Sequence, residues 1–256
     1  MVSSKLMGGL GNQMFQISAA HALALRNNDI SSFNLNSCFT PLQGKPSINY
    51  VDNIFKKINH DSTLKIKHTY KEITHNFTPI KYFDGLLLDG YFQSEKYFFD
   101  YQSEIIDLFT ISDLDKGIIN ELLSLNKYNS TTSIHVRRGD YLKYSDTHPV
   151  CDLDYYNKAM GMFENTTFIF ISDDIKWVKE NFKSDNIIYS PFNDEIMDLT
   201  LMTMCDNNII ANSTFSWWGA YLNKNKTKTV IAPNNWFTPK TGKNETDIIP
   251  VNWIKI

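Results

Sequence analysis

The stretch Thr132–Asp140, TSIHVRRGD, sets two adjacent arginines directly behind a short apolar run. The run Thr132–Val136 predicts a buried strand, so Arg137 and Arg138 lie where that strand ends. A guanidinium at a strand end is suited to hold a phosphate, because its planar fork donates two parallel hydrogen bonds to phosphoryl oxygens. The alternative is an exposed basic turn whose ion pair with Asp140 contributes only about 0–1 kcal/mol. Both interpretations are open on this stretch alone.

A second strand-turn-helix pattern lies near the N-terminus. Met7–Gln13 (MGGLGNQ) separates an apolar start, Val2 and Leu6, from a helical run that extends from Met14 to about Arg26. A glycine-rich turn before a helix presents backbone N–H groups to a phosphate at the positive helix end. The glycine spacing fits neither a G-x-G-x-x-G fingerprint nor a Walker loop. The alternative is an ordinary tight turn.

A third segment, Asn212–Ala220 (NSTFSWWGA), follows the apolar run Ile209–Ala211 and again predicts a strand, a hydroxyl-rich turn and a helix start. The hydroxyls of this turn either cap the helix or bind phosphate oxygens, since both roles use the same geometry. The residues concerned are Ser213, Thr214 and Ser216. At least one of the two tryptophans is expected to pack in the core.

The C-terminal half alternates between short apolar runs and amphipathic segments. We predict strands at Thr132–Val136, Thr167–Ser172, Ile187–Tyr189, Asn208–Ala211 and Thr229–Ile231, and helices at Leu153–Phe163, Asp174–Phe182, Glu195–Cys205 and Phe215–Asn223. This alternation is typical of a parallel sheet covered by helices on both faces, whose ligands bind at the carboxyl ends of the strands. Three segments fall at such ends and are expected to converge: His135–Asp140, Ser172–Asp174 and Asn212–Ser216.

The first half is less regular. A helix is predicted over Met14–Arg26, and strands over Ser32–Leu35 and the alternating Leu64–Tyr70. Two more helices, Tyr97–Leu108 and Asp113–Leu125, lead into a linker near residues 126–131. Alternation alone therefore supports an α/β architecture for the second half only.

Composition excludes several classes of protein. A chain of 256 residues with 42% hydrophobic residues can build a core, and its net charge of −3 without a basic stripe argues against nucleic acid as a partner. There is no run of 18 apolar residues, so we expect neither a transmembrane segment nor a cleavable signal. The three cysteines, Cys38, Cys151 and Cys205, fit neither a disulfide framework nor a zinc site. We expect a cytoplasmic protein, with peripheral attachment to the inner face of the membrane as the alternative.

Taken together, the motifs resemble glycosyltransferase family 11, the α-1,2-fucosyltransferases, within the wider fucosyltransferase superfamily. The matching segments, in family order, are Gly8–Gln16 (GGLGNQMFQ), His135–Tyr141 (HVRRGDY), Phe170–Asp174 (FISDD) and Ser213–Leu222 (STFSWWGAYL). The chain departs from the family at Ile17–Ala19, where an aromatic-small pair is usual, and between Phe33 and Asp84, where little matches. The unmatched segment lies in the part of the chain that is expected to bind the acceptor.

The resemblance implies a GT-B fold, an α/β architecture of two Rossmann-like lobes with the donor cleft between them. Residues 1–127 would form the N-terminal lobe, with the acceptor side and the glycine turn, and residues 128–256 the lobe that binds the GDP-sugar. The implied reaction transfers L-fucose from GDP-β-L-fucose to the 2-hydroxyl of a terminal galactose in a glycan. It inverts the anomeric centre and uses no cofactor. The rivals are a fucosyltransferase of another linkage, a transferase of another GDP-sugar, and a nucleotide-sugar-binding module without turnover.

The resemblance also assigns roles to single residues. Arg137 stabilises the leaving diphosphate, and with Asn12 and Asp140 it makes up the expected catalytic set. Arg138 either supports the loop through Asp140 or contacts the second phosphate. His135 contacts the nucleotide, with packing as the alternative. The other residues expected at the donor are Gly11 and Asn12 from the first lobe, and Ser213, Thr214, Phe215 and Ser216 from the second.

The resemblance further places Asp198 at the guanine base, where it accepts from N1–H and the 2-amino group; the alternative is a solvated carboxylate on a helix face. Asp173 and Asp174 are expected to cap the helix that follows them, with a contact to base or ribose as the alternative. The general base is not identified, although Asp140, Asp173, Glu95 and His21 are residues of suitable type.

Two Asp-x-Asp pairs raise the alternative of a divalent metal that neutralises the leaving group. They are Asp113–Asp115 and Asp152–Asp154. Both precede helical runs, where aspartate caps the helix and complements its dipole. We therefore expect capping at these pairs and no metal ligands in the site.

Overall fold

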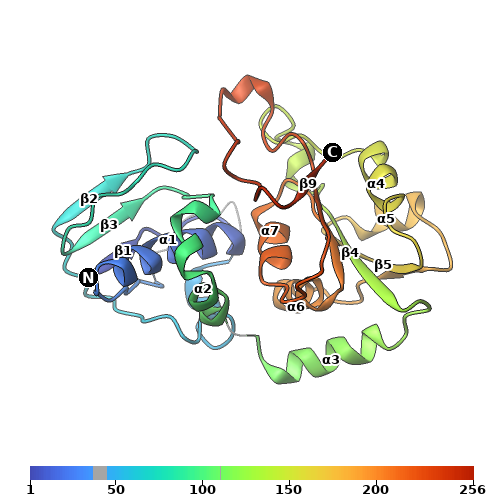
Figure 1. Cartoon of the computed structure of the whole chain (residues 1–256), viewed down its shortest axis with the longest axis horizontal. Coiled ribbons are helices and arrows are strands. Elements are labelled where there is room, and N and C mark those ends of the chain that lie inside the picture. Colours follow the sequence, from blue (N-terminus) through green and yellow to red (C-terminus); the bar gives the residue numbers. More distant parts are fainter. Residues whose placement is uncertain (37–44, 110) are drawn as a thin grey trace. The chain divides into compact units, whose positions relative to one another are not determined.

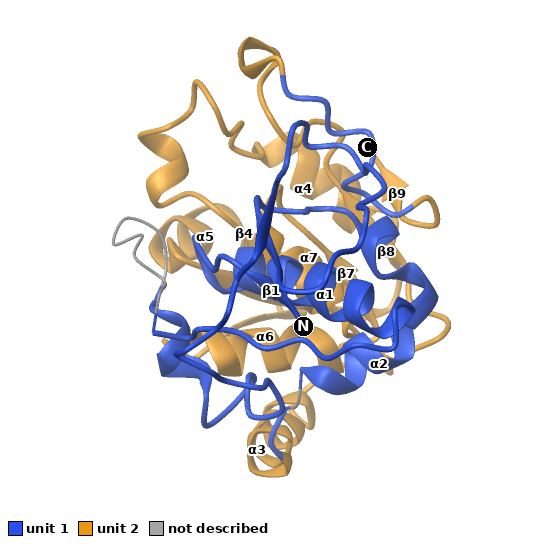
Figure 2. Ribbon diagram, turned by 90° about the vertical axis from the view of Figure 1, so that its left-hand side faces the viewer, with its two compact units in different colours: residues 1–112, 243–250 blue, residues 113–242, 251–256 orange. Residues whose placement is uncertain are grey.

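The computed structural model describes residues 1–36, 45–109 and 111–256. It has an α/β fold with two sheets, and every strand pairing in both is parallel (Figure 1). The chain divides into two compact units, coloured separately in Figure 2. Unit 1 comprises Met1–Ser112 and Lys243–Pro250, and unit 2 comprises Asp113–Gly242 and Val251–Ile256. The division falls before Asp113, whereas the sequence analysis placed residues up to 127 in the first lobe.

Unit 1 holds a three-stranded sheet in the order β1-β3-β2. Its elements are β1 (Val2–Ser4), α1 (Leu10–Arg26), η1 (Ser47–Tyr50), β2 (His68–Lys71), β3 (Leu86–Asp89), η2 (Glu95–Tyr97), η3 (Phe99–Tyr101) and α2 (Gln102–Leu108). The expected strand over Ser32–Leu35 is reduced to isolated bridges, in which Ser31 pairs with Val2 and Phe33 with His60. The helix expected from Tyr97 is broken into two short 3-10 turns before α2.

Unit 2 holds a six-stranded sheet in the order β6-β5-β4-β7-β8-β9. Its strands are β4 (Ser130–Val136), β5 (Thr166–Ser172), β6 (Ile187–Tyr189), β7 (Asn207–Ile209), β8 (Val230–Ala232) and β9 (Ile254–Lys255). Its helices are α3 (Asp113–Leu123), η4 (Asp140–Leu142), α4 (Leu153–Met160), α5 (Ile175–Asn181), α6 (Glu195–Met204), α7 (Thr214–Tyr221) and η5 (Pro239–Thr241). The predicted alternation of strands and helices is confirmed throughout this unit, and β9 is an addition to it.

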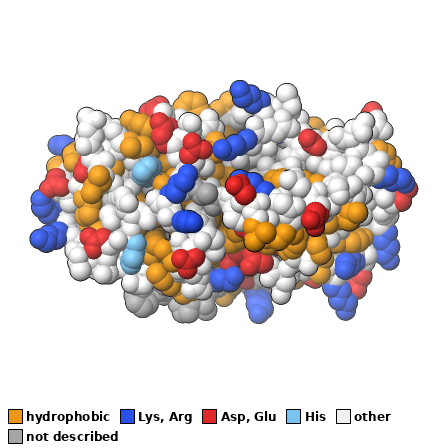
Figure 3. Space-filling model, turned by 90° about the horizontal axis from the view of Figure 1, so that it is seen from below, with side chains coloured by type: hydrophobic (Ala, Val, Ile, Leu, Met, Phe, Trp, Pro, Cys, Tyr) orange, Lys and Arg blue, Asp and Glu red, His pale blue; other side chains and the backbone are white. Residues whose placement is uncertain are grey.

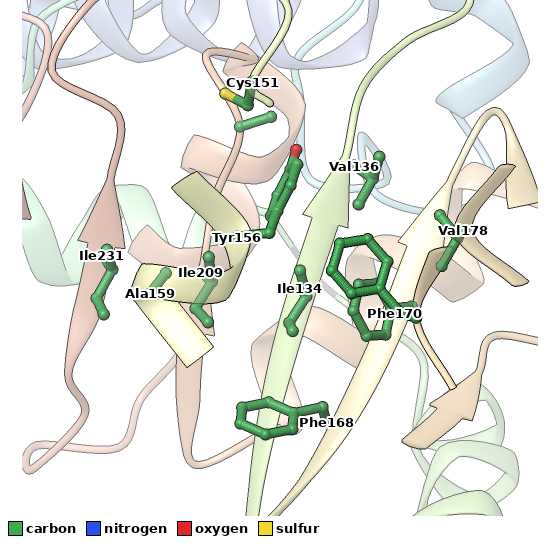
Figure 4. Close-up of a cluster of buried hydrophobic side chains, with 12 residues drawn as sticks. Ile134, Val136, Cys151, Tyr156, Ala159, Phe168, Phe170, Val178, Ile209 and Ile231 are labelled. Carbon is green, nitrogen blue, oxygen red and sulfur yellow. The ribbon is translucent and has the colours of Figure 1, made fainter. Parts of the chain in front are cut away.

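The core of unit 2 lies between the sheet and the helices that follow its strands. Figure 4 shows Ile134 and Phe170 of the two longest strands next to Tyr156 of α4 and Val178 of α5, all fully buried. Figure 1 shows α4 and α5 on one side of the sheet and α6 and α7 on the other. Both tryptophans of α7 are fully buried, which confirms the expectation that at least one packs in the core.

Aspartates cap the N-termini of three unit 2 helices, α4, α5 and α6. Asp152 accepts from the backbone N–H of Tyr155 at the start of α4, and Asp174 accepts from that of Trp177 at the start of α5. Asp194 caps α6 in the same way. Each cap satisfies a backbone donor that the helix itself leaves without a partner. The connections after the strands are therefore fixed at the carboxyl edge of the sheet.

The remaining sequence-based expectations concern cysteines, membranes and surface charge. Cys151 and Cys205 are free and buried, and Cys38 lies outside the described residues. Among the described helices none is long and apolar enough to cross a membrane. On the face shown in Figure 3, basic and acidic side chains are interspersed with apolar ones, and no patch of a single sign forms there.

Two helical glycines allow a test of the packing between α6 and α7. A Cβ at Gly219 would lie 2.7 Å from the Cβ of Met202, whereas a Cβ at Gly117 of α3 would meet no described atom within 4 Å. We predict that Gly219→Ala lowers the free energy of unfolding by about 1–3 kcal/mol, because overpacking outweighs the better helix propensity of alanine. Gly117→Ala should raise it by about 0.5–1 kcal/mol. Urea denaturation followed by circular dichroism measures both; equal effects of the same sign would contradict the packing argument.

Candidate active site

The turn after β4 holds Arg137 between two carboxylates. Its Nη2 lies 2.7 Å from Oδ1 of Asp140, and its Nη1 lies 3.0 Å from Oδ2 of Asp173. The guanidinium carbon is 5.4 Å from the ring centre of Tyr141, and the side chain is 33% exposed. Each Nη carries a second hydrogen, so an anion can still be bound from the open side. The sequence motif alone indicates a pair with Asp140 but gives no signal for the second carboxylate, Asp173.

Asp173 joins the ends of β4 and β5. Besides Arg137, its carboxylate accepts from the backbone N–H of Arg138 at 2.9 Å. A Cβ at Gly139 would come within 2.5 Å of Oδ2 of Asp173, so the close approach requires glycine at that position. The expected capping role is therefore wrong for Asp173, whose carboxylate points to the neighbouring strand end, and is confirmed for Asp174.

The side chain of Arg138 contacts different residues from those that hold Arg137. Its Nε lies 3.2 Å from Oδ2 of Asp174, and its guanidinium carbon lies 3.9 Å from the ring centre of Trp177. Such stacking contributes about 0.5–2 kcal/mol, more as the cation is desolvated. The expectation that Arg138 supports the loop through Asp140 is wrong, because Asp140 pairs with Arg137. Arg138 instead fastens the start of α5.

His135 is the next-to-last residue of β4 and is only 4% exposed. Its ring centre lies 5.5 Å from that of Phe215, and its Nδ1 has no hydrogen-bond partner among the described residues. Burial and the nearby positive charge of Arg137 lower the pKa of His135 to about 3. The imidazole is therefore neutral near pH 7 and able to take part in a hydrogen bond.

The hydroxyl side chains of the turn between β7 and α7 differ in burial and in their hydrogen bonds. Ser216 is fully buried and donates to the carbonyl oxygens of Ala211 (3.3 Å) and Ser213 (3.2 Å), so its hydroxyl serves the helix start. Ser213 precedes the helix without a side-chain capping bond. Thr214 and Phe215 are partly exposed in the first turn.

Asp198 lies on α6 and is partly buried. Its Oδ1 accepts from the hydroxyl of Ser190 at 2.6 Å, and Ser190 directly follows β6. Burial raises the pKa of Asp198 to about 6, and the bond from Ser190 partly offsets that increase. The carboxylate thus belongs to the same carboxyl edge of the sheet as the arginine turn. The sequence carries no motif signal for Ser190; only its place after a strand distinguishes it.

In unit 1, the glycine turn leads from β1 into α1 and is tied by amide side chains. Gly8 has a φ of +77°, and its carbonyl accepts from Nε2 of Gln13 at 2.9 Å. Gln16 bonds both the N–H and the carbonyl of Met7. Oδ1 of Asn12 accepts from Nε2 of Gln93 at 2.9 Å. The turn is therefore a rigid feature at the carboxyl edge of the β1-β3-β2 sheet.

The expected site residues divide between the two units. Gly11, which is buried, and Asn12 belong to unit 1, while the others belong to unit 2.

Of the candidate bases, His21 lies nine residues beyond Asn12 along α1, roughly 14 Å at 1.5 Å per residue, and pairs with Ser31. Burial raises the pKa of Glu95.

Both Asp-x-Asp pairs lie at helix starts. Asp152 caps α4, and Asp113, fully exposed in the first turn of α3, pairs with Lys116 at 2.9 Å. Within the described ranges no group of three or more histidine, cysteine or acidic side chains is placed to hold a metal ion.

Comparison with known proteins identifies the family to which the chain belongs. The family model described as glycosyl transferase family 11 matches residues 1–256. The chain is 31% identical to the O-antigen biosynthesis glycosyltransferase WbnK of Escherichia coli, over 99% of each chain. It is 30% identical to an alpha-1,2-colitosyltransferase of Escherichia coli, over 100% of this chain and 99% of that one. A galactoside 2-alpha-L-fucosyltransferase of Bos taurus is 26% identical over 84% of this chain and 62% of its own length.

Solved structures give the same fold at low sequence identity. The fucosyltransferase NodZ from Bradyrhizobium is similar with a TM-score of 0.53 and 13% identity, over 85% of this chain and 91% of that one. POFUT1 in complex with GDP-fucose is similar with a TM-score of 0.51 and 14% identity, over 90% and 97%. The matching motifs, the parallel α/β fold and the end-to-end alignment with bacterial transferases agree: the chain belongs to glycosyl transferase family 11.

Proposed function

We propose that this protein transfers L-fucose from GDP-fucose to the 2-hydroxyl of a terminal galactose, with inversion and without a metal ion. The observation that carries the proposal is Arg137, held by Asp140 and Asp173 at the carboxyl edge of the unit 2 sheet with its outer hydrogens still available. Similarity to an α-1,2-colitosyltransferase and to a galactoside 2-α-L-fucosyltransferase supports the linkage. The bacterial relative of O-antigen biosynthesis supports a surface polysaccharide or its precursor as acceptor.

In the proposed reaction the bond between the anomeric carbon of fucose and a β-phosphate oxygen breaks. The acceptor oxygen bonds to the opposite face of that carbon, and its hydroxyl proton passes to a carboxylate base or to the departing diphosphate. Negative charge builds on the diphosphate as it leaves, and a guanidinium already in place stabilises that charge more than it stabilises the bound ground state. Arg137 supplies the guanidinium, and Asp140 and Asp173 keep it oriented. Gly11 and Asn12 of the unit 1 glycine turn are proposed as further donor-binding residues, on the strength of their match to the family motif.

Colitose transfer is the second candidate, because one relative that aligns over the whole chain carries that activity in its name. Colitose is fucose without its 3-hydroxyl, so the two donors demand the same leaving-group chemistry. They differ only in whether the site accommodates and bonds one hydroxyl. A site built to bond a hydroxyl discriminates strongly against the analogue that lacks it.

A direct test uses GDP-fucose and GDP-colitose, each with galactose-terminated oligosaccharides, in EDTA and in added manganese or magnesium. We expect a product from GDP-fucose whose NMR spectrum shows an α-1,2 linkage, at similar rates under all metal conditions. A preference for GDP-colitose would establish the second candidate. A tenfold loss of rate in EDTA would contradict the metal-independent mechanism, and a different linkage would contradict the regiochemistry.

The two adjacent arginines provide a matched pair of substitutions. Lysine keeps the charge but not the bidentate fork, so Arg137→Lys should lower kcat by about 10²–10³ with a smaller change in the KM for the donor. Arg138→Lys should reduce kcat far less and instead lower stability, since its guanidinium stacks on Trp177. Steady-state kinetics and thermal unfolding separate the two effects. Reversed results would mean that Arg138, not Arg137, acts on the diphosphate.

Asp198 is proposed to accept from the guanine N1–H and 2-amino group, which requires its ionised form. Because the pKa of Asp198 is raised to about 6, GDP affinity should fall as the pH drops from 7.5 to 5, when the carboxylate becomes protonated. Asp198→Asn should weaken GDP binding by about 1–3 kcal/mol and flatten this pH dependence. Calorimetric titration measures both, with the exposed Asp154→Asn as control. Identical pH profiles for wild type and Asp198→Asn would remove Asp198 from the base site.

A further inference from the structure

Gln93, which the sequence analysis did not single out, lies four residues beyond β3 at the carboxyl edge of the unit 1 sheet. Its Nε2 donates to Oδ1 of Asn12, 2.9 Å away. The side chain is only 7% exposed, and its Oε1 is buried with no hydrogen-bond partner among the described residues. Native proteins rarely leave a buried amide oxygen without a partner. The geometry therefore calls for a bound group that donates to Oε1.

The turn before Gln93 is fixed by Glu72, the residue directly after β2. The carboxylate of Glu72 accepts from the backbone N–H groups of Tyr91 (2.6 Å) and Phe92 (2.9 Å). Gly90 packs directly on Glu72, where a Cβ would overlap the Cβ of the glutamate. Phe92 has a φ of +52° and buries its ring edge-to-face against Tyr97, with the ring centres 5.3 Å apart. Gln93 thus follows a braced turn, and its amide is held in place.

The chemistry of the amide pair restricts its ligand. An amide oxygen only accepts, and the oxygens of an ionised diphosphate also only accept, so Oε1 of Gln93 does not bond the diphosphate. A hydroxyl both donates and accepts. Oδ1 of Asn12 faces Gln93 and already accepts from its Nε2, whereas Nδ2 of Asn12 lies against Gly8. A neutral, fixed acceptor without a partner is complementary to the hydroxyl of a sugar.

We propose that Asn12 and Gln93 form a hydroxyl-binding subsite, in which Oε1 of Gln93 accepts a hydrogen bond from a sugar hydroxyl of the substrates. This inference rests on the proposed function for the presence of a sugar. The hydroxyl belongs either to the acceptor glycan or to the transferred deoxysugar. Both sources offer the same chemistry, and the kinetic constants of the two substrates distinguish them.

The test compares Gln93→Met, which removes both polar atoms at similar size, with Gln102→Met at an exposed position of α2. The KM for acceptor, the KM for GDP-sugar and the dissociation constant for GDP are measured for both. We expect Gln93→Met to raise one of the two sugar KM values at least tenfold while GDP binds within twofold of wild type. Gln102→Met should leave all three unchanged. A raised acceptor KM assigns the hydroxyl to the glycan, and a raised donor KM assigns it to the deoxysugar.

Monodeoxy analogues of the affected sugar sharpen this result. One analogue should bind wild type at least tenfold more weakly than its parent, and Gln93→Met should no longer distinguish the two. If Gln93→Met does not fold, Gln93→Asn replaces it, since the shorter side chain withdraws the same oxygen. Unchanged sugar constants in a folded variant, or a loss of GDP affinity equal to the loss of sugar affinity, would overturn the inference.

A binding measurement separates this outcome from failure of the proposed function. If wild type transfers no sugar from any GDP-sugar, the proposed function fails irrespective of Gln93. Saturation-transfer NMR then reports directly on binding of galactosides and fucose in the presence of GDP, without turnover. Contacts that disappear in Gln93→Met and persist in Gln102→Met support the subsite. Equal contacts in both variants contradict it.

Discussion

The parallel pairing of β4 with β5 is the constraint on which the arginine site depends. The two strands match over seven residues, and the register ends with Val136 opposite Ser172. The next residues along the two strands, Arg137 and Asp173, therefore come abreast and form their ion pair. A shift of this register by one residue would turn each side chain to the opposite face of the sheet and separate the pair. The buried aromatic and aliphatic side chains of both strands hold the register.

Two carboxylates around one guanidinium orient it but also compete with the ligand. Asp140 and Asp173 restrict the rotamers of Arg137, so less conformational entropy is lost when an anion binds. They also add negative charge close to where a diphosphate would bind. Such an arrangement would bind the diphosphate of the intact donor weakly. It would already be oriented when negative charge builds on the leaving group, and it would therefore favour the transition state over the ground state. The adjacent Arg138 has a different task, because its stacking on Trp177 and its bond to Asp174 anchor α5.

The two units offer different chemistry at equivalent places. At the carboxyl edge of the unit 2 sheet the charged groups are guanidinium and carboxylate, which suit a nucleotide diphosphate. At the carboxyl edge of the unit 1 sheet the amides of Asn12 and Gln93 form a neutral pair. A neutral amide forms hydrogen bonds with hydroxyls and, unlike a guanidinium, carries no net charge that would attract an anion. This contrast gives a physical reason for assigning sugar recognition, rather than phosphate binding, to Oε1 of Gln93.

The sequence by itself determined the α/β class, the parallel sheet of unit 2 and the placing of HVRRGD, FISDD and STFSWWG at strand ends. These follow from local periodicity and from capping residues, which act within a few positions of the chain. Only the tertiary structure decided which of the two aspartates after β5 meets Arg137, that Ser190 holds Asp198, and that Gln93 faces Asn12. Gln93 and Asn12 are 81 positions apart, and the pairing of β1 with β3 brings them together. Side chains that meet across strand ends depend on register and burial, neither of which a local pattern specifies.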